Sequence, residues 1–269
     1  MPVLSEADAA ACGAALFKAE ATRTQIRMMT ADHPDMDMDD AYAIQAAFVE
    51  RKLDAGGRIN GWKIGLTSKA MQYALGIDIP DSGILFEDMV FNHGGTVPDD
   101  RFIEPRIEAE IAFIMKTDLS GADVSRDDVI AATEAVAPAL EILDTRIYRA
   151  DPQSGATRTV LDTISDNAAN AGLVMGDMRH PMDAFDLRRV GAIVRRNDTV
   201  EETGLGAGVL DDPALSMAWL VHRLASYGDG LRAGDIVLSG SFVRPIEARH
   251  GDHFIADYGP FGTVDIAFA

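Results

Sequence analysis

Three glutamates are the residues of this chain whose types and spacing best suit metal chemistry. Glu108 and Glu110 lie in the alternating segment Arg106–Met115, and Glu141 interrupts the apolar segment Ala139–Leu143. Side chains two residues apart share one face of a strand, so Glu108 and Glu110 are expected to point the same way. A half-exposed strand with a polar outer face would show the same alternation. Glu141 favours a metal site, because a carboxylate among apolar neighbours needs a partner or an ion.

Together the three carboxylates would form an all-oxygen site. Mg²⁺ or Mn²⁺ suits such a site, whereas Zn²⁺ normally takes His or Cys ligands. Three glutamates also leave room in an octahedral shell for a chelating substrate and water.

Lys63 is the candidate cation beside this site. It lies in the alternating segment Trp62–Thr67, close to Gly65, where the missing side chain lets another group approach. Near a metal and removed from water, its amine is expected to lose its proton more readily, which fits a general acid/base. An edge-strand lysine that deters sheet aggregation would fit the same pattern.

Three further segments carry weaker indications. The polar run Asp162–Asn170 could line a pocket, but its own pattern favours a turn and a helix cap. Gly204–Gly208 lacks dinucleotide-binding spacing and is interpreted as a flexible loop or substrate lid. His250–His253 fits a polar turn better than a metal site.

The elements that must position these residues are helices first and strands later. A helix is expected from the cap Ser5–Asp8 towards Met29, and a second follows the acidic run Asp35–Asp40 and ends near Gly56. From Gly61 onwards short strands dominate, interrupted by helices whose caps are Ser125 and Asp212. The predicted fold class is α/β (α+β), with a helical N-terminal segment over residues 1–60 and a catalytic body over residues 61–269.

Composition limits the partners of this chain. It has 269 residues, and 43 Asp+Glu against 24 Lys+Arg give a formal charge of −19. This balance argues against nucleic acid and anionic membranes as partners. The lone Cys12 excludes an intramolecular disulfide and a cysteine-based zinc site. Without a run of ~18 apolar residues or a secretory signal pattern, a cytoplasmic protein is expected.

Several motifs together resemble the fumarylacetoacetase superfamily. They are Glu108-x-Glu110 with Glu141 further on, the strand Lys63–Thr67, and the turn Pro80-Asp81-x-Gly83. Within the superfamily, the chain is similar to the hydratases and decarboxylases of catechol meta-cleavage pathways. The resemblance runs from the helix at Ala41 to the last strand.

This resemblance implies a fold and a set of roles. The fold would be a mixed β-roll with outer helices, and Mg²⁺ or Mn²⁺ would bind to the three glutamates. Lys63 and Asp81 would be the acid/base pair, and Leu66 and Thr163 would contact a small-molecule substrate. A homo-oligomer, such as a decamer, is also implied.

Finer features resemble the branch that hydrates a 2-oxo-enoic diacid in homoprotocatechuate degradation. They are Gly65–Gln72, Asp162–Asn170 and Ser241–Pro245. The expected activity is therefore metal-dependent addition of water to a seven-carbon 2-hydroxy-2,4-dienoate or 2-oxo-enoate diacid. Arg244 is predicted to bind the distal carboxylate, because a guanidinium can hold a carboxylate through two hydrogen bonds. Arg146 and Arg158 are its competitors.

Three alternatives remain open. The decarboxylases of the family share the three glutamates, and the pentadienoate hydratases take a monoacid and have a more apolar segment where Arg244 stands. A non-catalytic scaffold partner in a hydratase–decarboxylase complex is the third. Lys63 and Asp81 argue against it, since a scaffold needs no proton-transfer pair.

Overall fold

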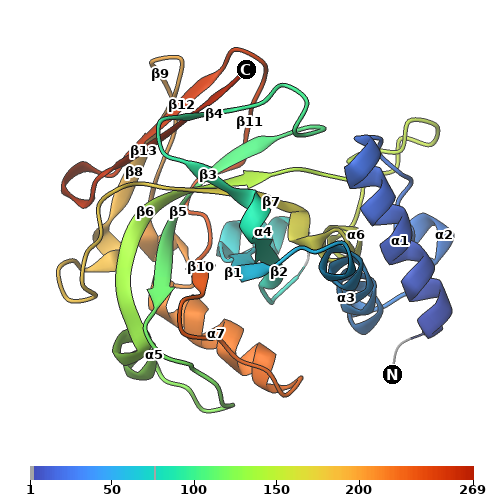
Figure 1. The fold of residues 1–269 in the computed structure, drawn as a ribbon, viewed down its shortest axis with the longest axis horizontal. Coiled ribbons are helices and arrows are strands. Elements are labelled where there is room, and N and C mark those ends of the chain that lie inside the picture. Colours follow the sequence, from blue (N-terminus) through green and yellow to red (C-terminus); the bar gives the residue numbers. More distant parts are fainter. Residues whose placement is uncertain (1–2, 76) are drawn as a thin grey trace.

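Two curled sheets form the body of the protein (Figure 1). The structure is a computed structural model that describes residues 3–75 and 77–269. In spatial order, the eight-stranded sheet contains β2 (Asp81–Phe86), β1 (Ile59–Gly65), β10 (Ile236–Leu238), β5 (Arg106–Met115), β6 (Thr133–Leu143), β7 (Asn170–Met175) and β3 (Val90–Asn92), with β11 (Ile246–Glu247) paired to β5. The five-stranded sheet contains β4 (Gly95–Val97), β13 (Thr263–Phe268), β12 (His253–Asp257), β8 (Gly191–Arg196) and β9 (Thr199–Leu205).

The larger sheet is mixed. β1 pairs in parallel with β10, and β3 with β7, whereas the remaining pairs in this sheet are antiparallel. Parallel and antiparallel pairing in one curled sheet, with helices outside, confirms the predicted β-roll.

The helices lie outside the sheets, and α1 and α3 are side by side at one end of the molecule (Figure 1). The longer ones are α1 (Glu6–Thr22), α3 (Met38–Asp54) and α7 (Pro213–Ala225), and the shorter ones are α2 (Met29–Asp32), α4 (Lys69–Leu75), α5 (Arg126–Ala132) and α6 (Val160–Ser165). Single 3₁₀ turns are η1 (Glu87–Met89), η2 (Asn167–Ala169), η3 (Leu187–Arg189), η4 (Gly206–Gly208) and η5 (Gly259–Phe261).

Most helix starts follow the predicted caps. The Ser5 hydroxyl accepts a hydrogen bond from the Asp8 amide, and Asp212 caps α7, with Pro213 in its first turn. The end of α1 was predicted wrongly, because the chain turns into the left-handed conformation at Arg23 (φ 49°), well before Met29.

Two large apolar cores and one smaller cluster hold these layers together. One lies between the two sheets and extends to α7. The other joins α1 and α3 to β2, where Phe48 packs with Ile84 and Phe86. The N-terminal helices and the strand body therefore share buried surface. β2 is held by its pairing with β1 and by its packing against α1 and α3.

Two sequence-based interpretations of loops have different outcomes. Asn197 and Asp198 both have positive φ, as a two-residue hairpin turn requires, and they confirm the predicted turn between β8 and β9. The flexible loop predicted at Gly204–Gly208 is wrong in part, because its first two residues end β9 and the rest form η4.

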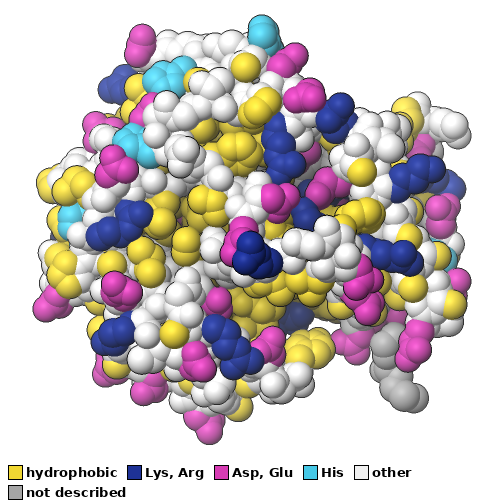
Figure 2. Space-filling model, in the orientation of Figure 1, with side chains coloured by type: hydrophobic (Ala, Val, Ile, Leu, Met, Phe, Trp, Pro, Cys, Tyr) yellow, Lys and Arg dark blue, Asp and Glu magenta, His cyan; other side chains and the backbone are white. Residues whose placement is uncertain are grey.

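Charge is dispersed over the surface. Figure 2 shows acidic and basic side chains interspersed on one face of the molecule. Among the residues that the structure describes, no helix combines the length and the apolar character needed to cross a membrane.

Candidate metal and acid/base site

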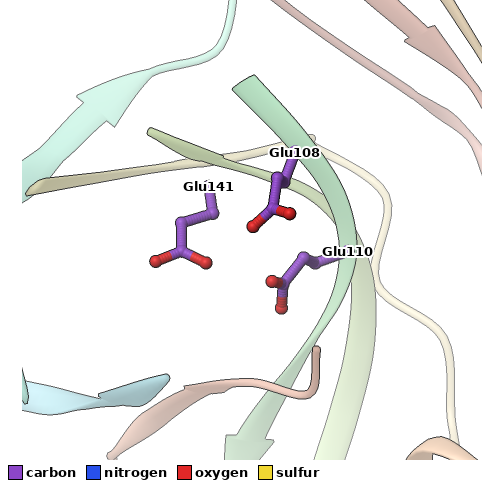
Figure 3. Close-up of side chains that lie close together, drawn as sticks. All are labelled: Glu108, Glu110 and Glu141. Carbon is purple, nitrogen blue, oxygen red and sulfur yellow. The ribbon is translucent and has the colours of Figure 1, made fainter. Parts of the chain in front are cut away.

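The three predicted glutamates converge on the inner face of the larger sheet. Glu108 of β5 lies directly opposite Glu141 of β6, and Glu110 lies two residues further along the same face of β5. One carboxylate oxygen from each residue lies within 4.8 Å of the others, and Figure 3 shows the three groups pointing toward one another. Glu110 is 1% exposed and Glu141 is 0% exposed. The predicted convergence is confirmed.

These carboxylates form few hydrogen bonds with the rest of the protein. Among the described residues, Glu110 Oε1 and both Glu141 oxygens have no hydrogen-bond partner, and Gly240 donates its amide to Glu110 Oε2 at 2.8 Å. Burial and the neighbouring Glu141 raise the pKa of Glu108 to about 8, and they raise the pKa of Glu110 well above its usual value. Like charges directly opposite on paired strands are destabilising. Buried oxygens in such an array fit a hard divalent cation.

The other candidate metal cluster does not form. In residues 3–75 and 77–269, Glu108, Glu110 and Glu141 form the one acidic or His/Cys group close enough to hold an ion. In the segment His250–His253, Asp252 accepts the Arg249 amide as a turn residue, which agrees with the predicted polar turn.

Lys63 reaches these carboxylates because the sheet curls. β10 and β5 separate β1 from β6, so a flat sheet would hold the two strands roughly 14 Å apart. In the curled sheet Lys63 is 3% exposed, and its Nζ lies 3.4 Å from Glu141 Oε1. The edge-strand alternative is therefore wrong, since β1 is paired on both sides.

Asp81 and Lys63 meet above Gly65, which is paired with Asp81 across β1 and β2. A Cβ atom at Gly65 would lie 2.2 Å from Asp81 Oδ1 and 3.0 Å from Lys63 Nζ. The missing side chain thus leaves the space in which the two groups approach each other, as the sequence predicted for this glycine.

Carboxylates set the protonation of Lys63 in the ion-free protein. Burial lowers the pKa of its amine, but Glu141 and Asp81 outweigh burial and hold this pKa above its usual range. The expectation of easier proton loss concerns an amine beside a bound metal and stays a prediction. In the ion-free protein, the number of carboxylates around one amine has the opposite effect. Burial raises the pKa of Asp81, and Lys63 partly offsets this effect.

We expect Gly65→Ala to lower kcat by about tenfold or more, because the new methyl group must push Asp81 away from Lys63. Overpacking of this kind also costs typically 1–3 kcal/mol of stability. Turnover and thermal unfolding should be measured together. Gly56→Ala, outside the cavity, is a control for lost stability alone, because its backbone is left-handed (φ 94°) but a Cβ atom there would contact nothing within 4 Å among the described residues. Full activity in a folded Gly65→Ala protein would contradict this account of the glycine.

A cavity of about 590 Å³ opens above the acidic group. It is lined by six of the eight predicted site residues, namely Lys63, Leu66, Asp81, Glu108, Thr163 and Arg244. Leu66 has a left-handed backbone (φ 55°), and its carbonyl accepts a hydrogen bond from Gln72 Nε2 at 2.8 Å. This strained position links the cavity wall to α4.

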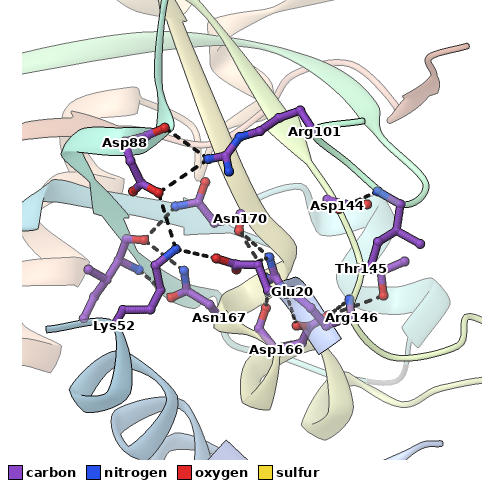
Figure 4. Close-up of polar contacts among 12 residues, drawn as sticks. Glu20, Lys52, Asp88, Arg101, Asp144, Thr145, Arg146, Asp166, Asn167 and Asn170 are labelled. Carbon is purple, nitrogen blue, oxygen red and sulfur yellow. Dashed lines mark hydrogen bonds and ion pairs between the residues drawn. The ribbon is translucent and has the colours of Figure 1, made fainter. Parts of the chain in front are cut away.

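The three arginines named from sequence lie in different settings. Arg244 lines the cavity, but its side chain is 79% exposed and pairs with Glu202. Arg158 also lines the cavity and is half-buried. Arg146 is buried between Asp166 and Glu20 and does not line the cavity, so it is wrong as a competitor for substrate (Figure 4).

The polar segment Asp162–Asn170 supports the cavity wall through its polar side chains, and Thr163 is the polar residue of the segment that lines the cavity. Asp162 forms a capping box with Thr159, and Asn167 exchanges two hydrogen bonds with the Ile84 backbone at 2.8 and 2.9 Å. The turn-and-cap interpretation is confirmed. Asn167, Ala168 and Ala169 are all left-handed (φ 54°, 51° and 58°), and the two alanines line the cavity.

Sequence reasoning missed two of the arginines that line the cavity, Arg106 and Arg149. Arg106 stands two residues before Glu108, and this spacing was the one available indication that it shares a face with the carboxylates.

Known proteins resemble this chain over most of its length. It is 48% identical over 253 residues to 2-oxo-hept-4-ene-1,7-dioate hydratase from Escherichia coli, covering 94% of this chain and 95% of that protein. It is 35% identical over 253 residues to 2-keto-4-pentenoate hydratase from Paraburkholderia xenovorans, covering 94% of this chain and 92% of the relative.

A solved structure agrees along the full chain. 4-Oxalocrotonate decarboxylase from Pseudomonas putida G7, complexed with magnesium and adipate, superposes with a TM-score of 0.94 at 31% identity and covers 100% of both chains. The model of the fumarylacetoacetate (FAA) hydrolase C-terminal family matches residues 62–267, which hold the three glutamates, Lys63 and Asp81. The chain belongs to this fumarylacetoacetate hydrolase family.

Proposed function

We propose that the protein is a Mg²⁺- or Mn²⁺-dependent hydratase that adds water to a 2-oxo-enoic diacid in aromatic meta-cleavage catabolism. The substrate would be 2-oxohept-4-ene-1,7-dioate and the product 4-hydroxy-2-oxoheptanedioate. The observation that carries the proposal is the convergence of three buried or half-buried carboxylates with Lys63 and Asp81 at one cavity. The hydratase relatives, at 48% and 35% identity, support the reaction class.

The residues of the chain suit the proton transfers of such a reaction. A 2-hydroxy-2,4-dienoate becomes a 2-oxo-3-ene when a proton is added at the far end of its conjugated system, and water then adds at C4. We assign Lys63 as the donor, since Glu141 and Asp81 raise the pKa of its amine in the ion-free protein. Asp81, whose Oδ1 has no hydrogen-bond partner among the described residues, is the acceptor. A divalent ion bound to Glu108, Glu110 and Glu141 would supply Lewis acidity for charge on the C2 oxygen.

Further assignments belong to this proposal. Leu66 and Thr163 would contact the substrate, and both line the cavity. The protein would act as a homo-oligomer, such as a decamer, in the cytoplasm.

A decarboxylase is the second candidate, and the superposition on 4-oxalocrotonate decarboxylase with a TM-score of 0.94 favours it. Such an enzyme would release the distal carboxylate as CO₂, because the electrons left by the broken bond can be delocalised through the alkene onto the 2-oxo oxygen. We place it second because the decarboxylase is 31% identical to this chain, against 48% for the diacid hydratase.

Assay of the purified protein with the seven-carbon dienol separates these functions. A hydratase removes the dienol absorbance without releasing CO₂, and EDTA stops the reaction until Mg²⁺ or Mn²⁺ is restored. Release of CO₂ in step with the absorbance change would establish the decarboxylase instead. Absence of turnover with seven-carbon, six-carbon and five-carbon substrates would leave the scaffold alternative.

A further inference from the structure

Three arginines, Arg106, Arg149 and Arg158, line the same cavity as the acid/base residues. Arg106 lies on β5, Arg149 lies in the loop after β6, and Arg158 precedes α6. They are close enough to affect one another, because burial together with Arg158 and Arg106 lowers the pKa of Arg149 to about 10. Burial likewise lowers the pKa of Arg158. Asp166, which lies beyond ion-pair distance, offsets part of this effect, and Arg106 adds to it. The protein thus brings three like charges to one wall.

In the described part of the chain, two of these guanidiniums have no acidic partner within ion-pair distance. Arg149 is held by Glu104, with Nε 3.2 Å from Oε2, and Arg158 donates from Nη1 to Thr145 Oγ1 at 2.6 Å. Among the described residues, no carboxylate oxygen lies within 4.0 Å of a guanidinium nitrogen of Arg106 or Arg158. Partly buried cations that repel one another and lack a counter-charge are costly, and an anionic ligand would remove this cost.

The strand sets the distance between the two ends of the cavity. Arg106 and Glu108 share one face of β5 and are separated by two residues, or roughly 7 Å along the strand. An extended short diacid spans a comparable length between its two carboxylates. One end of the cavity therefore suits an ion and a 2-oxo acid, and the other end suits a second carboxylate.

We propose that Arg106 and Arg158 bind the distal carboxylate of a diacid substrate, with Arg149 adding positive charge at the rim. This inference rests on the proposed function, whose substrate class it explains. A monoacid leaves both guanidiniums without a partner, so the arginines select for diacids. The sequence-based assignment of the distal carboxylate to Arg244 is the alternative. Arg244 is less suitable, because its side chain is exposed and already pairs with Glu202.

Binding of unreactive acids tests the inference without requiring turnover. Adipate and hexanoate, which differ in the second carboxylate, should be titrated calorimetrically into the Mg²⁺-loaded protein. We expect wild type to prefer adipate, and Arg158→Met and Arg106→Met each to lose about tenfold to a hundredfold in adipate affinity. Hexanoate affinity should change by less than about threefold. Arg232→Met is the matched control, because Arg232 is an exposed arginine paired with Asp229 outside the cavity.

Three outcomes would overturn the inference: equal affinity of wild type for both acids, unchanged preference in both methionine variants, or loss of the preference in Arg244→Met alone. If Arg158→Met does not fold, Arg158→Lys replaces it, and partial loss of the preference is expected because the charge remains but the forked geometry does not. Adipate binding that depends on Arg158 in a protein without hydratase activity would refute the proposed function and keep the inference. If the protein hydrates the diacid and these variants keep the preference for diacids, the proposed function stands and the inference is refuted.

Discussion

A Lys63→Ala variant is expected to lose about 10²–10⁴-fold in kcat, the usual contribution of a general acid or base. Lys63 is the ammonium group that faces both Glu141, at 3.4 Å, and Asp81 across Gly65. Its loss removes the proton donor that we assign. Turnover of the seven-carbon dienol should be compared with wild type at saturating Mg²⁺.

The same variant separates catalysis from ion binding. The three glutamates remain, and the ammonium that would repel a cation is gone, so Mg²⁺ affinity should be no weaker than in wild type. Lys18→Ala, at an exposed lysine of α1, is the control for a lost amine. Wild-type turnover in Lys63→Ala would refute the catalytic role, and loss of Mg²⁺ binding would show that Lys63 acts on the ion site instead.

Stability of the ion-free protein is expected to fall as the pH rises from about 5.5 to about 8. The folded state raises the pKa of Glu108 to about 8, above that of an ordinary glutamate in the unfolded chain. In this window the folded protein holds protons that the unfolded chain has released, so raising the pH favours unfolding. The loss should be on the order of a few kcal/mol in the free energy of unfolding.

Mg²⁺ should reverse this trend, because it binds the deprotonated carboxylates of the folded state. Thermal unfolding between pH 5.5 and 8, in EDTA and in Mg²⁺, measures both effects, and the gap between the two Tm values should widen with pH. Glu108→Gln should flatten the EDTA curve. A Tm in EDTA that rises over this range, or that Mg²⁺ leaves unchanged at pH 8, would contradict the ion site.

Local sequence patterns predicted much of the fold. The bounds of β5 follow from the alternation of Arg106–Met115, and the start of α7 follows from Asp212 and Pro213. The burial of Glu141 was also predictable, because its neighbours in sequence are apolar. Each of these features depends on residues close together in the chain.

What could not be predicted depends on distant pairing. The register that sets Glu108 opposite Glu141 is fixed by how β5 and β6 pair across the intervening α5, and the sheet must curl before Lys63 reaches Glu141. Arginines are ordinarily surface residues, so sequence alone did not separate Arg146, which is buried in ion pairs, from Arg158, which faces the cavity.

The left-handed turn at Asn167–Ala169 makes the shape of the cavity depend on a distant helix. Left-handed backbone costs about 1–2 kcal/mol per residue for L-amino acids, so this turn persists only where its surroundings hold it. Those surroundings include Arg146, which bonds the Asp166 carboxylate and backbone before the turn and reaches Glu20 of α1 (Figure 4). A substitution in α1 could therefore alter which substrates fit while leaving every residue that touches them in place, and directed evolution for a new substrate should sample α1 as well as the cavity.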